Sequence, residues 1–129
     1  MFLKNKKVIR TVQVIFGLIL IFFALNTFFQ FSAAPEFNEA ATAFLTALFN
    51  TGYILPLMAF AWLIAGILYI INRWSALATI LIFPITVNIL LFHLLLDLTG
   101  TLFALIFVIL NIYFIIVHWK AYRPLFKGK

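Results

Sequence analysis

The chain has 129 residues, of which 67% are hydrophobic and 9% are charged, and it contains no cysteine. Soluble domains average about a quarter charged residues, so this composition excludes a soluble globular domain and indicates a protein whose solvent is lipid. The net charge of +6 does not indicate a nucleic-acid partner, because basic and acidic residues are segregated along the chain, and the lack of cysteine excludes disulfides, thiolate metal sites and cysteine nucleophiles.

The first hydrophobic segment follows a basic collar that runs from Lys4 to Arg10. A membrane-spanning helix needs about 20 mostly apolar residues, so the uncharged stretch predicts a first span at about residues 8–29. The apolar run is longer than that of a secretory signal and no small-residue cleavage pattern follows it, so we expect this segment to be retained. Asn26 and Gln30 are four residues apart and share a helix face near its far end.

The next segment predicts an amphipathic helix at about residues 35–50 that lies in the outer interface. Ser32 is the expected cap, and Pro35 falls in the first turn, where its missing N–H is tolerated. Gly52 ends the helix. Its apolar face is expected to comprise Phe37, Ala41, Phe44, Leu45 and Leu48.

Three further spans are predicted at about residues 53–71, 76–96 and 101–119, joined by tight turns. Connections this short make successive spans antiparallel neighbours. The tail from residue 120 onward is expected to be basic and solvated. The predicted fold is therefore a single all-α membrane domain, an antiparallel four-helix transmembrane bundle with one extra interfacial helix.

The charge distribution predicts the orientation of this bundle. The basic residues lie in the N-terminal collar, at Arg73 in one turn and in the tail, whereas the acids are Glu36, Glu39 and Asp97. Cytoplasmic segments carry the excess of Lys and Arg, so we expect both termini in the cytoplasm and the three acids outside.

The third predicted span holds the residues that are best suited to chemistry. His93 and Asp97 are one helical turn apart, and an aspartate beside a histidine fixes its tautomer and raises its pKa, as a proton relay or general base requires. The alternative is structural: Asp97 caps the following turn and His93 hydrogen-bonds a neighbouring helix. If the pair is coupled, Asp97→Asn changes the titration of His93.

Four amides are the candidate ligand-binding residues. Asn88 and Asn111 lie at similar depth in the third and fourth spans and are either inter-span hydrogen-bonding groups or contacts to a ligand head group or quinone. Asn26 and Gln30 form an outward-facing pocket with His93 and Asp97 if the first and third spans meet there. His118 lies in an interfacial aromatic belt. The two histidines, with no cysteine, do not predict a metal or haem site.

The chain resembles the DoxX-like family of small bacterial membrane proteins over nearly its whole length. The most specific matching stretches are P-I-T-V-N-I-L-L-F-H at residues 84–93 and A-Y-R-P at residues 121–124. Further ones are F-G-L-I-L-I-F-F-A-L-N-T-F-F, A-x-x-F-L-T-A-L, T-G-Y-I-L-P-L, A-G-I-L and N-R-W, at residues 16–29, 41–48, 51–57, 65–68 and 72–74. The resemblance implies a four-span bundle in the bacterial cytoplasmic membrane.

Some members of the family are linked to quinone-coupled oxidation of sulfur compounds and others to oxidative-stress assemblies. The resemblance implies that Asn26, Asn88, His93 and Asp97 correspond to polar positions of the family. One departure is that relatives carry an acidic residue in the second span, where this chain has Trp62. A proton or redox role that depends on that acid is therefore not implied here.

Three functions are compatible with these features. The leading hypothesis is a non-enzymatic accessory or assembly subunit that packs against other membrane proteins or against its own copies in the bilayer. The second is a quinone-linked redox accessory in which His93 and Asp97 handle the proton. The third is a small transporter or lipid-binding protein that acts as an oligomer.

Overall fold

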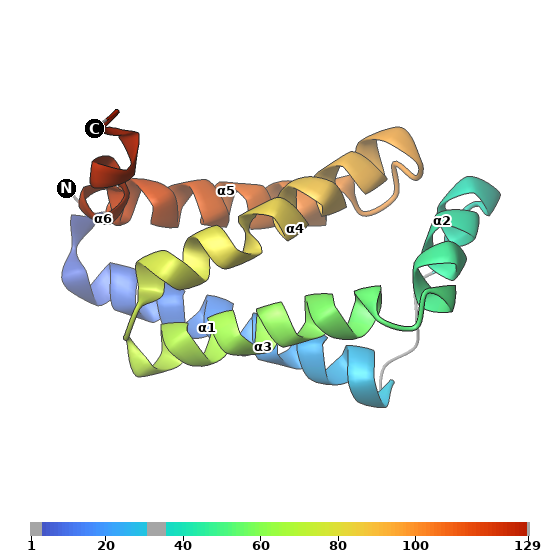
Figure 1. The fold of residues 1–129 in the computed structure, drawn as a ribbon, viewed down its shortest axis with the longest axis horizontal. Coiled ribbons are helices and arrows are strands. Elements are labelled where there is room, and N and C mark those ends of the chain that lie inside the picture. The colour runs from blue at the N-terminus through green and yellow to red at the C-terminus, as the bar shows by residue number, and fades with distance from the viewer. Residues whose placement is uncertain (1–3, 31–35, 129) are drawn as a thin grey trace.

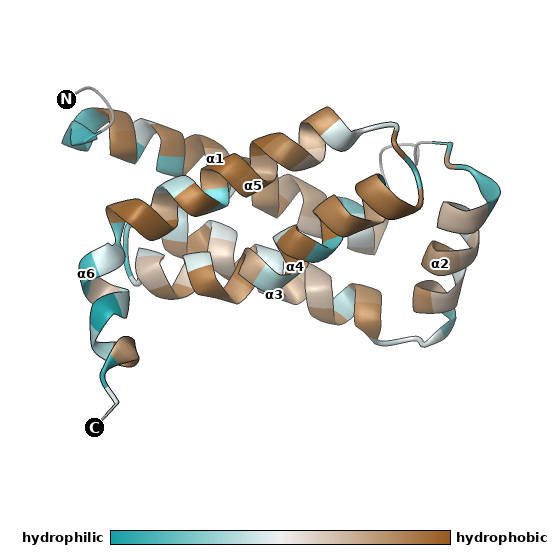
Figure 2. Cartoon of the chain, turned by 90° about the horizontal axis from the view of Figure 1, so that it is seen from above, coloured by the Kyte–Doolittle hydropathy of each residue, from teal (hydrophilic) through white to brown (hydrophobic). Residues whose placement is uncertain are grey.

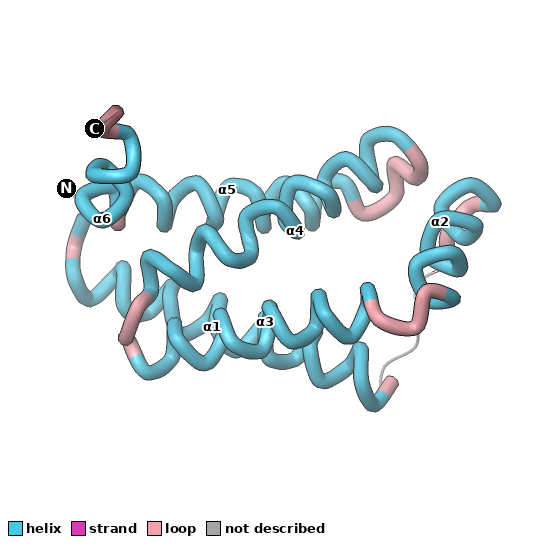
Figure 3. The backbone as a smooth tube through the Cα atoms, viewed as in Figure 1, coloured by secondary structure: helices cyan, strands magenta, loops and turns pink. Residues whose placement is uncertain are grey.

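A computed structural model describes residues 4–30 and 36–128, and every regular element in these ranges is helical. Four long helices, α1 (Lys6–Phe29), α3 (Ile54–Ile71), α4 (Ser75–Leu95) and α5 (Thr101–Val117), run roughly alongside one another (Figure 1). Two short helices, α2 (Glu39–Asn50) and α6 (Trp119–Tyr122), stand at opposite ends, and a 3₁₀ turn at Arg123–Phe126 follows α6. The loops are short and lie only at the helix ends (Figure 3).

Three of the helices, α1, α3 and α4, are long and apolar enough to cross a membrane, which indicates a membrane protein. The fourth long helix, α5, has 17 residues, and the chain then bends by 72° into the segment Trp119–Phe126; if this bent pair is one broken span, the number of candidate spans rises to four. Hydrophobic residues dominate the long helices, whereas hydrophilic ones gather near the chain ends and at the start of α2 (Figure 2).

The long helices pack as two layers, α1 with α3 and α4 with α5, and α3 also contacts α4 (Figure 1). The predicted neighbours are therefore in contact. The α1–α3 crossing is close because glycines face each other: a Cβ on Gly17 would lie 2.8 Å from the carbonyl oxygen of Gly66. Small residues at a crossing let two backbones approach in this way.

The core between the layers is aromatic. The ring of Phe16 in α1 is fully buried, and its centroid lies 5.6 Å from that of Tyr69, 5.4 Å from Phe107 and 5.9 Å from Phe114. These contacts join α1 to α3 and α5, at spacings typical of favourable ring pairs.

Polar side chains of α1 hydrogen-bond to the C-terminal end of α3, next to the turn that contains Arg73. The guanidinium of Arg10 donates to the carbonyls of Tyr69 (2.7 Å) and Ile70, and the buried amide of Gln13 donates to Tyr69 (2.8 Å) and to the side chain of Asn72 (2.9 Å). The last carbonyls of a helix have no partner within the helix, so these bonds supply what α3 lacks.

One predicted boundary is wrong. The interfacial helix predicted at about residues 35–50 begins at Glu39, and residues 36–38 are not helical. The side chain of Asn38 accepts a hydrogen bond from the Ala41 N–H (2.9 Å) and caps the helix at this point. The expected cap Ser32 and the first-turn Pro35 lie outside the described residues.

The span predicted at residues 101–119 ends at Val117, and the tail is not simply solvated. The side chain of Tyr122 is buried, and its hydroxyl donates to the carbonyl of Ala76 at the start of α4 (2.5 Å). This contact holds the segment after the bend against the bundle, whereas the basic residues Lys120, Arg123 and Lys127 remain exposed.

Candidate functional site

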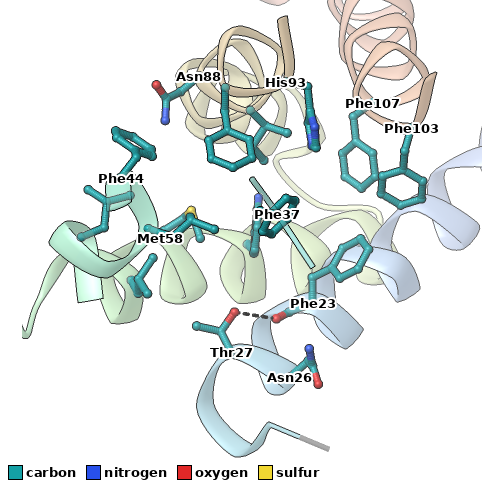
Figure 4. A pocket seen from close by; sticks show the side chains of 16 residues that line it. Phe23, Asn26, Thr27, Phe37, Phe44, Met58, Asn88, His93, Phe103 and Phe107 are labelled. Carbon is teal, nitrogen blue, oxygen red and sulfur yellow. Dashed lines mark hydrogen bonds between the residues drawn. The ribbon is translucent and has the colours of Figure 1, made fainter. Parts of the chain in front are cut away.

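A cavity of about 400 Å³ opens between the two helix layers beneath α2 (Figure 4). Its walls are mostly aromatic, and no charged side chain lines it among the described residues. The aromatic side chains are Phe23, Phe37, Phe44, Trp62, Phe92, Phe103 and Phe107. The polar ones are Asn26, Thr27, Asn88 and His93.

Contacts between α1, α3 and α5 build the inner wall. The ring of Phe23 lies 6.1 Å from that of Trp62 and 5.8 Å from each of Phe103 and Phe107, measured between centroids. Phe103 and Phe107 are one turn apart on α5 and so face the same way. Trp62, which stands where the family resemblance implies an acid, is a buried part of this wall.

Helix α2 covers the cavity with its apolar face. Phe44, Leu45 and Leu48 line the cavity and Ala41 is buried, whereas Glu39 is exposed, so the predicted apolar face is confirmed. The ring of Phe44 lies 5.8 Å from that of Phe92 in α4. The apolar side of α2 is therefore turned toward the bundle.

The residue that precedes α2, Asn38, is hydrogen-bonded to Asp97 in the α4–α5 turn. Its carboxylate accepts hydrogen bonds from the Asn38 N–H (2.9 Å), the Thr99 N–H (3.0 Å) and the Thr99 hydroxyl (2.5 Å). The Asn38 amide in turn donates to the carbonyl of Leu96 (2.5 Å). The Thr99 hydroxyl and then the Asn38 N–H hold the pKa of the Asp97 carboxyl below its usual 3.8, because these bonds favour the ionised form.

His93 meets the main chain of Asp97. Its Nδ1 lies 3.2 Å from the carbonyl oxygen of Asp97, while the carboxylate is engaged by Asn38 and Thr99. A carbonyl oxygen only accepts, so Nδ1 carries the proton in this contact, and Nε2 of the neutral ring is an acceptor. Asp97 therefore caps the turn after α4, as the structural alternative in the sequence analysis expects. His93 contacts Asp97 through the backbone carbonyl of Asp97.

Gly100 makes the position of this imidazole possible. Its φ of +82° lies in the left-handed region, and a Cβ there would lie 2.8 Å from Cε1 of His93. The turn after α4 therefore needs glycine at this position both for its backbone and for the ring packed against it.

The predicted site residues divide into two groups. Asn26, Asn88 and His93 line the same cavity, with Asn26 and His93 half-buried and Asn88 exposed. Gln30 lines a separate, smaller pocket beside Gly52, and Asp97 lies outside the cavity. The structure therefore brings α1 and α4 together at Asn26 and His93, but it does not bring all four residues into one pocket.

Asn111 lies away from the cavity and is fully buried. Its amide oxygen accepts from the Thr86 hydroxyl (2.8 Å), and its amide nitrogen donates to the carbonyl of Thr79 (3.2 Å). Both partners belong to α4, so the predicted inter-helix hydrogen bonding is confirmed for Asn111.

None of the predictions above includes the aromatic wall of the cavity. The available signal was helical spacing: Phe92 lies four residues after Asn88, and Thr27 four residues after Phe23. The Thr27 hydroxyl itself donates to the Phe23 carbonyl (2.9 Å; Figure 4). Such spacing places aromatic and polar side chains on one face of a helix.

Across residues 4–30 and 36–128, no three His, Asp or Glu side chains are grouped closely enough to hold a metal ion. His118 lies at the opposite end, where its Nδ1 is 2.9 Å from the Phe114 carbonyl.

Comparison with protein-family models, curated proteins and solved structures found no match to this chain.

Proposed function

We propose that this chain is a DoxX-like protein that crosses the bacterial cytoplasmic membrane four times. In this proposal it acts as a non-enzymatic accessory subunit and holds a small neutral ligand in the cavity beneath α2. The observation that carries this proposal is the cavity itself: about 400 Å³, walled by aromatic rings and furnished with a few hydrogen-bonding groups. Small-molecule sites in proteins have this character.

The four-span arrangement is supported by the position of the charges. The N-terminal collar, the α3–α4 turn and α6 lie at one end of the long helices, and the start of α2 and the α4–α5 turn lie at the other (Figure 1). The first group carries basic residues, and the second carries Glu39 and Asp97. Counting α5 and the bent segment as the fourth span places both chain ends on the side that carries the basic residues. By the positive-inside rule that side is the cytoplasm.

The lining defines the chemistry of the ligand. A charged ligand would lose its hydration without gaining an ionic partner from the cavity wall, because no lining side chain is charged. A planar ring would stack or pack edge-on against Phe23, Trp62 and Phe107. The amide groups of Asn26 and Asn88 suit a carbonyl or hydroxyl on that ring, and Nε2 of His93 suits a hydroxyl.

A quinone-linked redox accessory is the second candidate, and the His93 contact favours it. With Nδ1 donating to the Asp97 carbonyl, Nε2 of the neutral ring accepts a hydrogen bond. A quinol hydroxyl is a suitable donor, and a quinone carbonyl is not. In this scheme a membrane redox partner accepts the two electrons of the quinol, and His93 takes one of the two protons that the oxidation releases.

The test uses Trp62 as a reporter in protein reconstituted into lipid nanodiscs. Trp74 and Trp119 do not line the cavity, so the Trp74→Phe/Trp119→Phe variant leaves the fluorescence of Trp62 alone. Menadione, a neutral naphthoquinone, is expected to quench this fluorescence saturably. Adding Leu48→Phe and Ile89→Phe fills the cavity and should weaken binding tenfold or more, or about 1.4 kcal/mol.

The matched control is Leu57→Phe, because Leu57 is 64% exposed on α3 and does not line the cavity. Quenching that does not saturate, or that is equal in the filled and control variants, would show partition into lipid and contradict the proposal. The redox candidate is tested separately by comparing menadiol with menadione. If His93→Phe leaves their affinity ratio unchanged, only the redox candidate is discarded.

A further inference from the structure

A second apolar groove lies between α1 and α5, toward the end that carries the basic collar. Its volume is about 570 Å³, and its apolar walls are Val8 and Val12 on α1 with Ile109 and Leu110 on α5. The main packing partner of α1 is α3, and that of α5 is α4, so these two helices leave a furrow between them. The lining on α1 covers about 7–8 Å along the helix axis.

The mouth of the groove is cationic. Lys7 lines it, and Lys4 and Lys6 are exposed on the same short stretch of chain. The nearby Arg10 cannot serve as the groove's cation in the same way, because its guanidinium is bonded to the carbonyls of Tyr69 and Ile70. No acidic residue lies in the first turn of α1, and the described acids Glu36, Glu39 and Asp97 belong to the opposite end of the molecule.

This charge is unfavourable for α1 in isolation. Lysines in the first turn of a helix repel the positive end of its dipole, and an anion placed there relieves the repulsion. An apolar furrow that opens on clustered lysines matches a molecule with a hydrocarbon chain and a negatively charged head. Thr11 and Tyr113 also line the groove, and the Thr11 hydroxyl donates to the Lys7 carbonyl (2.8 Å).

We propose that this groove binds one anionic glycerophospholipid of the cytoplasmic leaflet, with the phosphate at the Lys7 ammonium and the start of an acyl chain between Val12 and Ile109. The site is separate from the cavity beneath α2 and shares no lining residue with it. Its occupancy therefore does not depend on the ligand of that cavity.

The experiment is native mass spectrometry of the full-length chain in detergent, titrated with phosphatidylglycerol or with phosphatidylcholine of the same acyl chains. Wild-type protein should bind the first phosphatidylglycerol more tightly than the first phosphatidylcholine. Lys7→Gln should weaken phosphatidylglycerol binding about fivefold, the effect expected of one lysine near an anionic head group, and leave phosphatidylcholine unchanged. Lys120→Gln removes the same charge from exposed α6 and should change either lipid less than twofold.

A second pair of variants tests the groove itself. Ile109→Trp projects into the groove and should weaken binding of both lipids, whereas Ile116→Trp, at a similarly exposed position on α5, should not. Equal effects of Lys7→Gln and Lys120→Gln would show a diffuse surface field and overturn the proposal. Unchanged lipid binding by Ile109→Trp would also overturn the proposal. A dimer that Ile109→Trp dissociates would overturn it too, because the groove would then be occupied by a second copy of the chain.

Discussion

At the scale of single residues, the position of His93 depends on a glycine that makes no side-chain contact of its own. Gly100→Ala places a side chain at φ +82° and against Cε1 of His93. We expect a loss of about 1–3 kcal/mol of stability from the backbone strain, and a further loss from displacement of the imidazole. Thermal unfolding in nanodiscs measures the first effect, and the histidine ring signals in NMR measure the second.

Gly52→Ala is the matched control for this prediction. Gly52 has a φ of +77° with open space around its Cβ position, so its substitution introduces the strain without the clash. If both variants are destabilised equally and the His93 signals do not move in Gly100→Ala, the contact between the turn and the ring has no role.

Asn111 is the residue whose hydrogen bonds should contribute most clearly to holding α4 against α5. Asn111→Leu keeps the approximate size of the side chain and removes the bonds to Thr86 and Thr79. The expected cost is about 0.6–2 kcal/mol, the range for inter-helix hydrogen bonds in membranes. Asn88→Leu, at an exposed position on α4, should leave unfolding unchanged and alter only ligand binding. The reverse pattern would contradict both assignments.

At the scale of elements, α2 covers the cavity, and its N-cap residue Asn38 is hydrogen-bonded to Asp97. Asp97→Asn keeps one acceptor oxygen and replaces the other with an NH₂ group, so the side chain can no longer accept from both Asn38 and Thr99. One carboxylate oxygen accepts twice from Thr99 and the other accepts from Asn38, so we expect the amide oxygen to stay with Thr99 and the bond to Asn38 to be lost. We expect residues 38–50 to exchange amide hydrogens faster, with the Asn38 N–H affected most. Glu36→Gln removes an exposed carboxylate close by in sequence and should leave this exchange as it is in the wild type.

The same contact predicts a pH dependence. Because the folded pKa of Asp97 is lowered, its contribution to stability is complete above the usual carboxyl pKa of 3.8 and is lost as the pH falls through the lower folded value. The difference in melting temperature between wild type and Asp97→Asn should therefore be constant from neutral pH down to about 5 and shrink only in stronger acid. A difference that disappears between pH 7 and 5 would show that another group is titrating.

At the scale of the whole molecule, the charges separate the two ends of the bundle. Since the sequence has no cysteine, single substitutions Lys120→Cys and Glu39→Cys each introduce one thiol at an exposed position. In intact cells, a membrane-impermeant maleimide should label Glu39→Cys and not Lys120→Cys, and cell lysis should expose the second. Labelling of both from outside would refute the orientation with both termini in the cytoplasm.

The sequence predicted well those features that depend on local pattern. The existence of the five main helices, the apolar face of α2 and the buried role of Asn111 follow from hydrophobic length, helical periodicity and the cost of an unsatisfied amide in lipid. These properties are set by residues that lie within a few turns of one another. They remain visible without knowledge of the tertiary fold.

Other features depend on contacts between distant parts of the chain and so could not be predicted. The bend after Val117 is stabilised by Tyr122 reaching Ala76, 46 residues earlier, and the start of α2 is fixed by Asn38 together with Asp97. The aromatic wall combines Phe23, Trp62 and Phe107 from three helices. Each of these helices has many apolar residues, and the pattern of one helix does not show which of them face a cavity.

The central claim is that the cavity beneath α2 holds a neutral ligand, and the most direct measurement is native mass spectrometry of gently solubilised protein followed by solvent extraction of what it retains. We predict one small neutral molecule per chain, such as a quinone, which is lost from the Leu48→Phe/Ile89→Phe variant and kept by Leu57→Phe. A protein that carries only phospholipid, in equal amounts in all three forms, would contradict the claim.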